Sequence, residues 1–341
     1  SKESKVLQEI GEGCGWAEEK IVYEGSEVLL ELRSYQAPHP AWIEETRKHP
    51  EILRLQVVQP VLPVLARGKD QVPFSSCEEM MIYHDPESQD PWEVALAYES
   101  ARGGISREEV RTLMDRSFEV MRKGVESGLK GTDYQDRILG SQSPLYKAEM
   151  EKGKLSKDDA LHRITLYVSA LMEVKSSMGV IVAAPTAGSC GTFPGAVLGV
   201  ADSLAKPKDE VVNALLTGSL VGIFIAASST FSAEIGGCQA ECGSGAGMAA
   251  AALVTLMGGK LEQSMAAASM ALQNSLGMIC DPIAARVEAP CLGKNVSAAA
   301  NALTSANMVL AGYDPLIPLD EVIFTMDRVG KSLPMELKCT A

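Results

Sequence analysis

The chain has 341 residues and a formal charge of −13, because 44 Asp and Glu residues outnumber 31 Lys and Arg residues. With 46% hydrophobic and 22% charged residues, it has the composition of a folded globular protein rather than of a disordered or fibrous chain. The negative charge repels phosphate backbones and anionic lipids, so nucleic acid and membrane surfaces are poor partners. The first residues resemble neither a secretory signal nor a transit sequence, and we expect a cytoplasmic location.

The first sixty residues differ from the rest and predict a small α+β unit. Two β-rich runs meet at Gly25, a short helical piece begins at Pro40, and a third run of β-branched residues begins at Glu51. The predicted boundaries are a small unit over residues 1–65, a linker over 66–72 and a larger domain over 73–341.

Helix signals dominate the larger domain, which we predict to be mostly α. Capping residues predict three helices: one from Asp90 to Gly103, one from Ser106 to Gly128, and one from Ser156 to about Gly179. The polar, glycine-rich segment 128–154 is long for a connection, so it is either functional or mobile.

An uncharged stretch, residues 211–233, is long enough to cross a bilayer. Its Ser, Thr and Gly residues make it weakly apolar, and a helix buried in protein fits it better than a membrane span. Only 16 Asp, Glu, Lys or Arg residues fall between residue 211 and the end of the chain. Helices with so few charges must be surrounded by other protein, either in a core or in a subunit interface.

A glycine-spaced segment, APTAGSCGTFPGA from Ala184, is the first candidate for a binding site. Its glycines allow backbone N–H groups to approach an anionic group closely, although a tight loop between packed helices is the plain structural alternative. The segment lacks the Lys of a phosphate-binding P-loop. We predict that it lines a substrate pocket through Thr186, Ala187, Gly188, Ser189 and Gly191.

Cysteines provide the second candidate. Cys238, Cys280 and Cys291 each lie where a helix is expected to begin or end, so their thiolates could face a common point. The chain has no zinc-type Cys-x-x-Cys pair, and none of its four histidines lies beyond residue 162. Three thiolates without histidine favour an iron–sulfur centre over zinc.

Several motifs together resemble the iron–sulfur-dependent L-serine dehydratases, also called L-serine ammonia-lyases. The segments PTAGSCGTFPGA, GGCQAECGS, CDP, VEAPC, NALTSANMVLAG and VGKSLP follow in the order expected for the α-subunit or α-domain of that family, over about residues 73–341. The N-terminal unit is similar to the end of the family's β-domain, a small fold of the ACT-related kind. The resemblance implies a small amino-acid substrate and either a homo-oligomer or a separate β-chain.

The same resemblance implies a 4Fe–4S cluster held by Cys238, Cys280 and Cys291, with one iron open to substrate and no pyridoxal phosphate. The open iron would act as a Lewis acid on the substrate carboxylate and β-hydroxyl, while a base removes the α-proton. Cys339 could fill the open position at rest, or could simply belong to an ordinary C-terminal segment.

The chain also departs from the family pattern. Cys242 stands where we expect a residue such as Val, and could be an accidental neighbour, a spare ligand or an oxidation liability. A Ser/Thr-Gly-Gly run and a Ser-Ser-His-Thr segment are absent, which leaves substrate preference and the base open. His84 is our candidate base, with a thiolate, Lys294 or a group from a partner chain as alternatives.

Three functions follow. The first is a lyase that converts L-serine to pyruvate and ammonia, or a related lyase acting on L-threonine or L-cysteine. The second is a cluster-bearing α-chain that is inactive without a separate β-chain. The third, a thiol redox protein using Cys238 and Cys242, lacks the expected βαβ context.

Overall fold

The computed structural model describes residues 10, 14–24, 28–34, 38–57, 72–85 and 90–338, in two compact units, Ser1–Pro60 and Val61–Ala341. Gly25, Cys339 and all of the predicted linker except Val72 lie outside the described residues.

The N-terminal unit contains an antiparallel pair of strands, β1 (Glu19–Glu24) and β2 (Val28–Arg33), and the short helix α2 (Pro40–Arg47). The His39 ring caps the start of α2 by accepting the backbone N–H of Ala41 at 3.2 Å. This arrangement confirms the predicted α+β character. The run from Glu51 differs from prediction, because residues 51–57 form no strand. β-branched residues favour a strand only where a neighbour pairs with them, and none of the described residues does so here.

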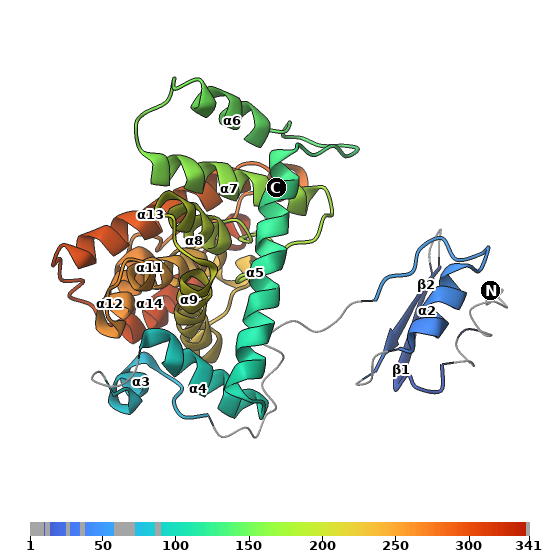
Figure 1. Cartoon of the computed structure of the whole chain (residues 1–341), viewed down its shortest axis with the longest axis horizontal. Helices are drawn as coiled ribbons and strands as arrows, with labels where there is room; N and C mark the ends of the chain where they lie inside the picture. Colours follow the sequence, from blue (N-terminus) through green and yellow to red (C-terminus); the bar gives the residue numbers. More distant parts are fainter. Residues whose placement is uncertain are drawn as a thin grey trace. The chain divides into compact units, whose positions relative to one another are not determined.

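The larger unit is built from helices, which confirms the mostly-α prediction (Figure 1). Its helices are α3 (Cys77–Tyr83), α4 (Pro91–Gly103), α5 (Arg107–Leu129), α6 (Ser143–Glu151), α7 (Asp159–Ser176), α8 (Thr192–Ser203), α9 (Lys208–Ser228), α10 (Ala233–Gly236), α11 (Ser244–Leu256), α12 (Leu261–Gln273), α13 (Cys291–Leu310) and α14 (Leu319–Ser332). A π-helical turn, Gln239–Gly243, leads into α11, and short 3-10 turns cover Ile283–Ala285 and Met335–Leu337.

Helix α11 forms the centre of this unit and packs against α8, α9, α12 and α13 (Figure 1). Its sequence, SGAGMAAAALVTL, is made almost entirely of small and apolar residues, nearly all of them buried. Small residues let neighbouring helices approach: a Cβ on Gly218 of α9 would lie 2.6 Å from the carbonyl oxygen of Met248. The low charge of the second half of the chain therefore reflects helices enclosed by other helices.

Helix α9 contains most of the uncharged stretch. Among the described residues it is the one helix long and apolar enough to cross a membrane, yet most of that stretch is buried inside the unit. Leu215 and Phe224 are fully buried, and the helix packs against α4, α5, α8, α11 and α14. The prediction of a helix buried in protein agrees with this packing.

The capping residues in the sequence predict the starts of α4 and α5 correctly, but not that of α7. Capping boxes start α4 at Asp90 and α5 at Ser106, as predicted. The C-cap of α4 is Gly104, in the left-handed conformation, one residue after Gly103, which the sequence predicts as the cap. Helix α7 is capped by Asp158 instead of Ser156. Ser156 contacts His162 instead: its hydroxyl oxygen lies 3.1 Å and its carbonyl oxygen 2.7 Å from His162 Nε2.

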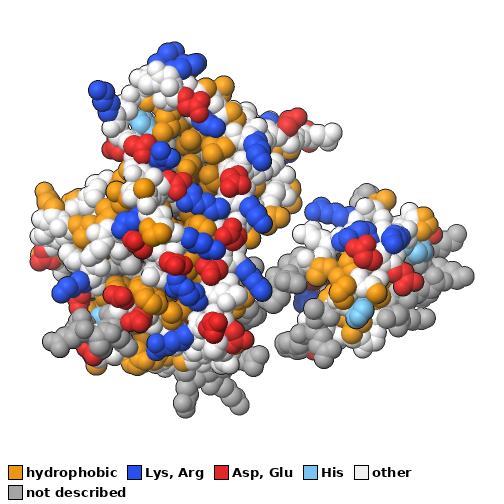
Figure 2. Space-filling view, in the orientation of Figure 1, with side chains coloured by type: hydrophobic (Ala, Val, Ile, Leu, Met, Phe, Trp, Pro, Cys, Tyr) orange, Lys and Arg blue, Asp and Glu red, His pale blue; other side chains and the backbone are white. Residues whose placement is uncertain are grey.

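The face crossed by α5 carries interspersed basic and acidic side chains (Figure 2). Lys208 of α9 pairs with Glu119 of α5 at 2.8 Å, and Arg122 holds both carboxylate oxygens of Asp202. These pairs join α5 to the neighbouring helices α8 and α9.

Candidate active site

A cavity of about 250 Å³ lies where the three cysteine-bearing segments meet the glycine-spaced loop. The residues that line it are Thr186, Ala187, Gly188, Ala233, Glu234, Cys238, Glu241, Cys280, Asp281, Pro282, Val287, Cys291 and Lys294. All three cysteines predicted as ligands therefore face one space, although the first, Cys238, and the last, Cys291, are 53 residues apart in the sequence. The thiols are buried, with residue exposures of 4% for Cys238 and 7% for Cys280 and for Cys291.

Cys238 lies at the start of the π-helical turn, between α10 and α11. Such turns are rare and often mark functional sites. Gly237 precedes the turn with a φ of +73°, and a Cβ there would lie 2.8 Å from the carbonyl oxygen of Met278. Only glycine combines this backbone conformation with this close approach.

Gln239 attaches the π-helical turn to the segment that carries Cys280. Its amide nitrogen donates to Met326 O at 2.9 Å, and its amide oxygen accepts the N–H of Gly277, also at 2.9 Å. The backbone N–H of Gln239 donates to Met278 O at 3.1 Å. Through these bonds Gln239, which is fully buried, fixes Cys238 relative to Cys280.

Cys280 is also joined to the C-terminal segment. Its N–H donates to Leu337 O at 3.0 Å, and Cys280 pairs with Lys338 in a short parallel bridge. Lys338 is the last described residue, so the predicted role of Cys339 lies outside the described residues.

The loop from Thr186 to Gly191 is held by hydroxyl groups. Thr186 Oγ1 lies 3.0 Å from Ser189 Oγ, accepts the N–H of Ser189 at 3.2 Å, and donates to Glu241 Oε1 at 2.7 Å. Of the five residues predicted to line a substrate pocket, Thr186, Ala187 and Gly188 line this cavity. Ser189 and Gly191 do not line it: Ser189 supports Thr186, and Gly191 packs against α7, where a Cβ would lie 2.9 Å from Met172 Cγ.

Asn295, on the second turn of α13, ties this loop to Cys291. Its side-chain nitrogen donates to Gly188 O at 2.9 Å and to Cys291 O at 3.0 Å. Its side-chain oxygen accepts the hydroxyl and the N–H of Thr192, at 2.8 and 3.1 Å. The side chain is fully buried and every polar group is engaged, which fixes Cys291 against the glycine-spaced loop.

The thiols and the partly buried carboxyl of Glu241 differ in proton affinity. The Cys242 thiol donates to Cys238 and so holds the pKa of Cys238 below its usual value, while the same bond and burial raise the pKa of Cys242. Burial raises the pKa of Cys291 to about 11 in the protein without a bound metal. Burial also raises the pKa of Glu241, against the opposing effect of its hydrogen bond from Thr186.

Two lysines bring positive charge to this region. Lys294 lines the cavity; its Nζ donates to Ile279 O at 2.6 Å and to the carboxylate of Asp281. Lys175 of α7 donates to Val287 O, and burial lowers its pKa, although nearby Cys190 and Cys291 act in the opposite direction. Negative charge in the cavity would thus have cationic groups beside it.

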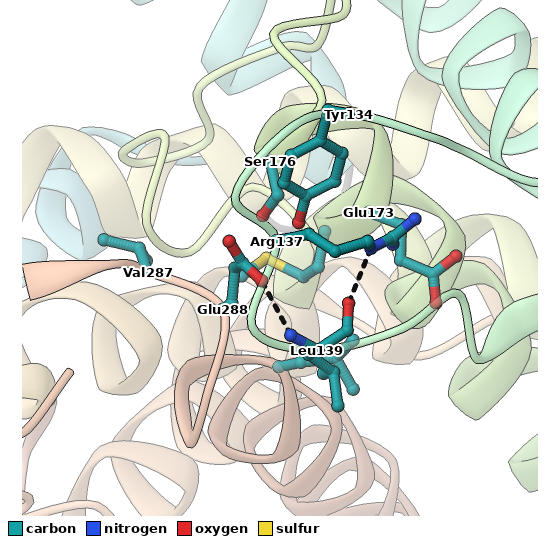
Figure 3. A pocket seen from close by; sticks show the side chains of 9 residues that line it. Tyr134, Arg137, Leu139, Glu173, Ser176, Val287 and Glu288 are labelled. Carbon is teal, nitrogen blue, oxygen red and sulfur yellow. Dashed lines mark hydrogen bonds between the residues drawn. The ribbon is translucent and has the colours of Figure 1, made fainter. Parts of the chain in front are cut away.

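The polar segment after α5, predicted to be either functional or mobile, is attached to Glu288 and to Glu173 of α7 (Figure 3). The Glu288 carboxylate accepts the N–H groups of Ile138 and Leu139, each at 2.9 Å, and Glu173 of α7 accepts those of Gln142 and Ser143. The space enclosed between these groups is only about 10 Å³, too small for a substrate. This segment therefore supports the site from outside the cavity.

His84, our candidate base, caps the end of α3 and does not line the cavity. It is buried, and its Nδ1 has no hydrogen-bond partner among the described residues. Lys294, the alternative base, does line the cavity. Sequence reasoning missed Glu241, Asn295 and Lys175. Glu241 lies three residues after Cys238, and its acidic side chain in a nearly uncharged segment was the available signal.

Comparisons with known proteins agree with the motifs. Residues 74–341 match the family model described as serine dehydratase alpha chain. The chain is 37% identical over 248 residues to the probable L-serine dehydratase alpha chain of Bacillus subtilis, over 73% of this chain and 83% of that protein. It is 38% identical over 251 residues to the L-serine dehydratase alpha chain of Peptoniphilus asaccharolyticus, over 73% of this chain and 86% of that protein. It is 32% identical over 244 residues to L-serine dehydratase 2 of Escherichia coli, over 69% of this chain and 53% of that protein. The chain therefore belongs to the serine dehydratase alpha chain family.

Proposed function

We propose that this chain deaminates L-serine to pyruvate and ammonia, using a 4Fe–4S cluster bound by Cys238, Cys280 and Cys291 and no pyridoxal phosphate. The observation that carries the proposal is that these three thiols line one cavity together with the Thr186–Gly188 segment. The names of the relatives support L-serine as the substrate. L-Threonine and L-cysteine are the alternative substrates.

The donor set fits such a cluster. Thiolates are the usual ligands of iron–sulfur clusters, and each binds a different iron, so the sulfurs stand further apart than around one ion. In the described ranges, no three His, Cys, Asp or Glu side chains are grouped closely enough to hold a single metal ion. The cavity of about 250 Å³ has room for a group much larger than one water molecule. Lys294 and Lys175 would offset the negative charge of a cluster with three thiolates.

When bound, the cluster would supply a Lewis-acidic iron that makes the β-hydroxyl a better leaving group. The chain itself would hold the substrate between this site and the 186–188 loop, whose hydroxyl and backbone groups are fixed by Ser189 and Asn295. Loss of the α-proton and of hydroxide gives aminoacrylate and water, and hydrolysis of aminoacrylate then gives pyruvate and ammonia.

The proposal has two forms, which differ in the source of the group that accepts the α-proton: this chain itself or a separate β-chain. No histidine is among the residues that line the cavity, and Lys294 is engaged with Asp281. A base from a separate β-chain is therefore the second candidate, favoured by the names of two relatives as alpha chains. A thiol redox role for Cys238 and Cys242 has no comparable support.

The test is a steady-state assay on the anaerobically reconstituted chain. Pyruvate and ammonia formed in equal amounts from L-serine by the chain alone would support the complete enzyme. Activity that appears only after addition of a β-chain would support the second form. A chain with full cluster content that releases neither product under either condition would overturn both.

A further inference from the structure

We infer that Glu241 binds the α-ammonium group of the amino-acid substrate and thereby makes the site specific for amino acids over hydroxy acids. This inference deepens the proposed function and rests on it. It starts from the placement of one carboxylate in the cavity lined by the three cysteines.

Glu241 is held with one oxygen engaged and the other open. Oε1 accepts the Thr186 hydroxyl at 2.7 Å, whereas Oε2 accepts no hydrogen bond from the described residues. Gly188 faces the carboxylate so closely that a Cβ there would lie 2.8 Å from Oε2. The absence of a side chain at residue 188 therefore leaves the space beside Oε2 open.

The other acidic groups that line the cavity are less suited to this role. Asp281 is paired with Lys294, and Glu234 is exposed and accepts the Ser232 hydroxyl at 2.6 Å. Glu241 is partly buried, lines the cavity and keeps one carboxylate oxygen without a partner among the described residues. Hydrogen bonds between a carboxylate and a charged donor are roughly twice as strong as neutral ones, so an ammonium group suits this oxygen best.

The chemistry of the substrate supplies that donor. The carboxylate and β-hydroxyl of serine are the groups suited to the iron, which leaves the ammonium with its N–H donors for the protein. The positive side chains nearby, Lys175 and Lys294, would repel an ammonium, so a carboxylate is needed on the side where it binds. Glycerate, which carries a hydroxyl in place of the ammonium, offers Glu241 no positive charge.

The test compares the binding of L-serine and L-glycerate by calorimetry to the reconstituted wild type, Glu241→Gln and Glu234→Gln, each with verified iron and sulfide content. Gln keeps the acceptor for Thr186 but removes the charge. We expect Glu241→Gln to bind L-serine about tenfold or more weakly, as for loss of a charge-assisted hydrogen bond, and to bind L-glycerate as the wild type does. Glu234→Gln should keep the wild-type preference for L-serine.

Kinetics provide a second readout. Glu241→Gln should raise KM for L-serine more than it lowers kcat. Unchanged L-serine affinity with a large loss of kcat would overturn the inference, because it would make Glu241 a proton carrier rather than an ammonium anchor. If Glu241→Gln weakened the binding of L-serine and of L-glycerate by the same factor, that result would also overturn the inference. Either result leaves the proposed function standing as long as the wild type releases pyruvate, whereas a wild type that binds no L-serine overturns both.

Discussion

The side-chain nitrogen of Asn295 donates to the carbonyl oxygen of Gly188 at 2.9 Å, and this bond joins the first turns of α13 to the glycine-spaced loop. The same nitrogen donates to Cys291 O at 3.0 Å. One buried amide thus sets the distance between a proposed cluster ligand and a wall of the proposed substrate cavity.

Replacement of Asn295 tests this connection. Asn295→Ala leaves buried groups of Gly188 and Thr192 without their partner, which costs about 1–3 kcal/mol per unsatisfied group. We expect a lower melting temperature and a lower cluster content after reconstitution. Asn307→Ala, at an exposed position of the same helix, is the control and should change neither. A stable Asn295→Ala variant that keeps full cluster content would refute the connection.

Gly188 should tolerate no side chain. Gly188→Ala places a Cβ within 2.8–2.9 Å of both carboxylate oxygens of Glu241, so the carboxylate must move. We expect weaker L-serine binding, measured by calorimetry, with an unchanged cluster spectrum. Gly293→Ala, in α13 near Cys291, meets nothing within 4 Å and should bind L-serine normally. Wild-type affinity in Gly188→Ala would show that the loop does not border the substrate.

Gly237 should tolerate no side chain, because both its backbone conformation and its close neighbours require glycine. Gly237→Ala combines a φ of +73° with contacts at 2.8 Å to Met278 O and Leu333 Cδ1, whereas Gly258→Ala has a φ of +84° and open space. With a ψ of 179°, Gly237 lies in a backbone region that is essentially restricted to glycine, and strain there costs about 1–3 kcal/mol. We therefore expect Gly237→Ala to lower the free energy of unfolding by more than Gly258→Ala does, and to reduce cluster content. Equal losses of unfolding free energy in the two variants would contradict this prediction, because they would mean that the π-helical turn moves to admit the added Cβ at no cost.

Glu288 should make the folding stability fall at acid pH, because its carboxylate holds the segment that contains Ile138 and Leu139. Burial alone would raise the pKa of Glu288, but the N–H groups of Leu139 and Ile138 outweigh it and hold the pKa below its usual value. Because the pKa is lower in the folded than in the unfolded protein, the carboxylate stabilises the fold above pH ~4.3, and this contribution is lost at lower pH.

The measurement is the free energy of unfolding of wild type and Glu288→Gln as a function of pH. The wild type should be the more stable at neutral pH, and the difference should shrink as the pH falls below about 4. Glu126→Gln, exposed on α5, is the control for the substitution itself and should leave the free energy of unfolding at neutral pH unchanged. A difference that is constant over the whole range would contradict the role given to the ionised carboxylate.

Much of the fold could be predicted because its signals are local. The capping boxes at Asp90 and Ser106 depend on residues three apart, and α4 and α5 begin where they predict. The start of α7 was misplaced: Asp158 caps the helix and Ser156 contacts His162 instead, which the spacing of residues does not reveal. Helix α6 was read as part of a long polar connection, since it has little apolar surface to signal its presence.

The site was predictable only in part. The three cysteines came from their positions and from the family resemblance, and they do line one cavity. The partners of Asn295 and Glu241 lie 107 and 55 residues away in the chain, so no local pattern could pair them. The same holds for Lys175, whose acceptor Val287 lies 112 residues away.

The content of iron and acid-labile sulfide in the reconstituted chain and its Cys→Ser variants tests the central claim most directly. The account predicts about four of each per wild-type chain, and loss of the intact cluster in Cys238→Ser, Cys280→Ser and Cys291→Ser. Cys77→Ser, in α3 and not among the residues that line the cavity, should keep wild-type content. Full cluster content in all three cavity variants, or no iron in the wild type, would contradict the account.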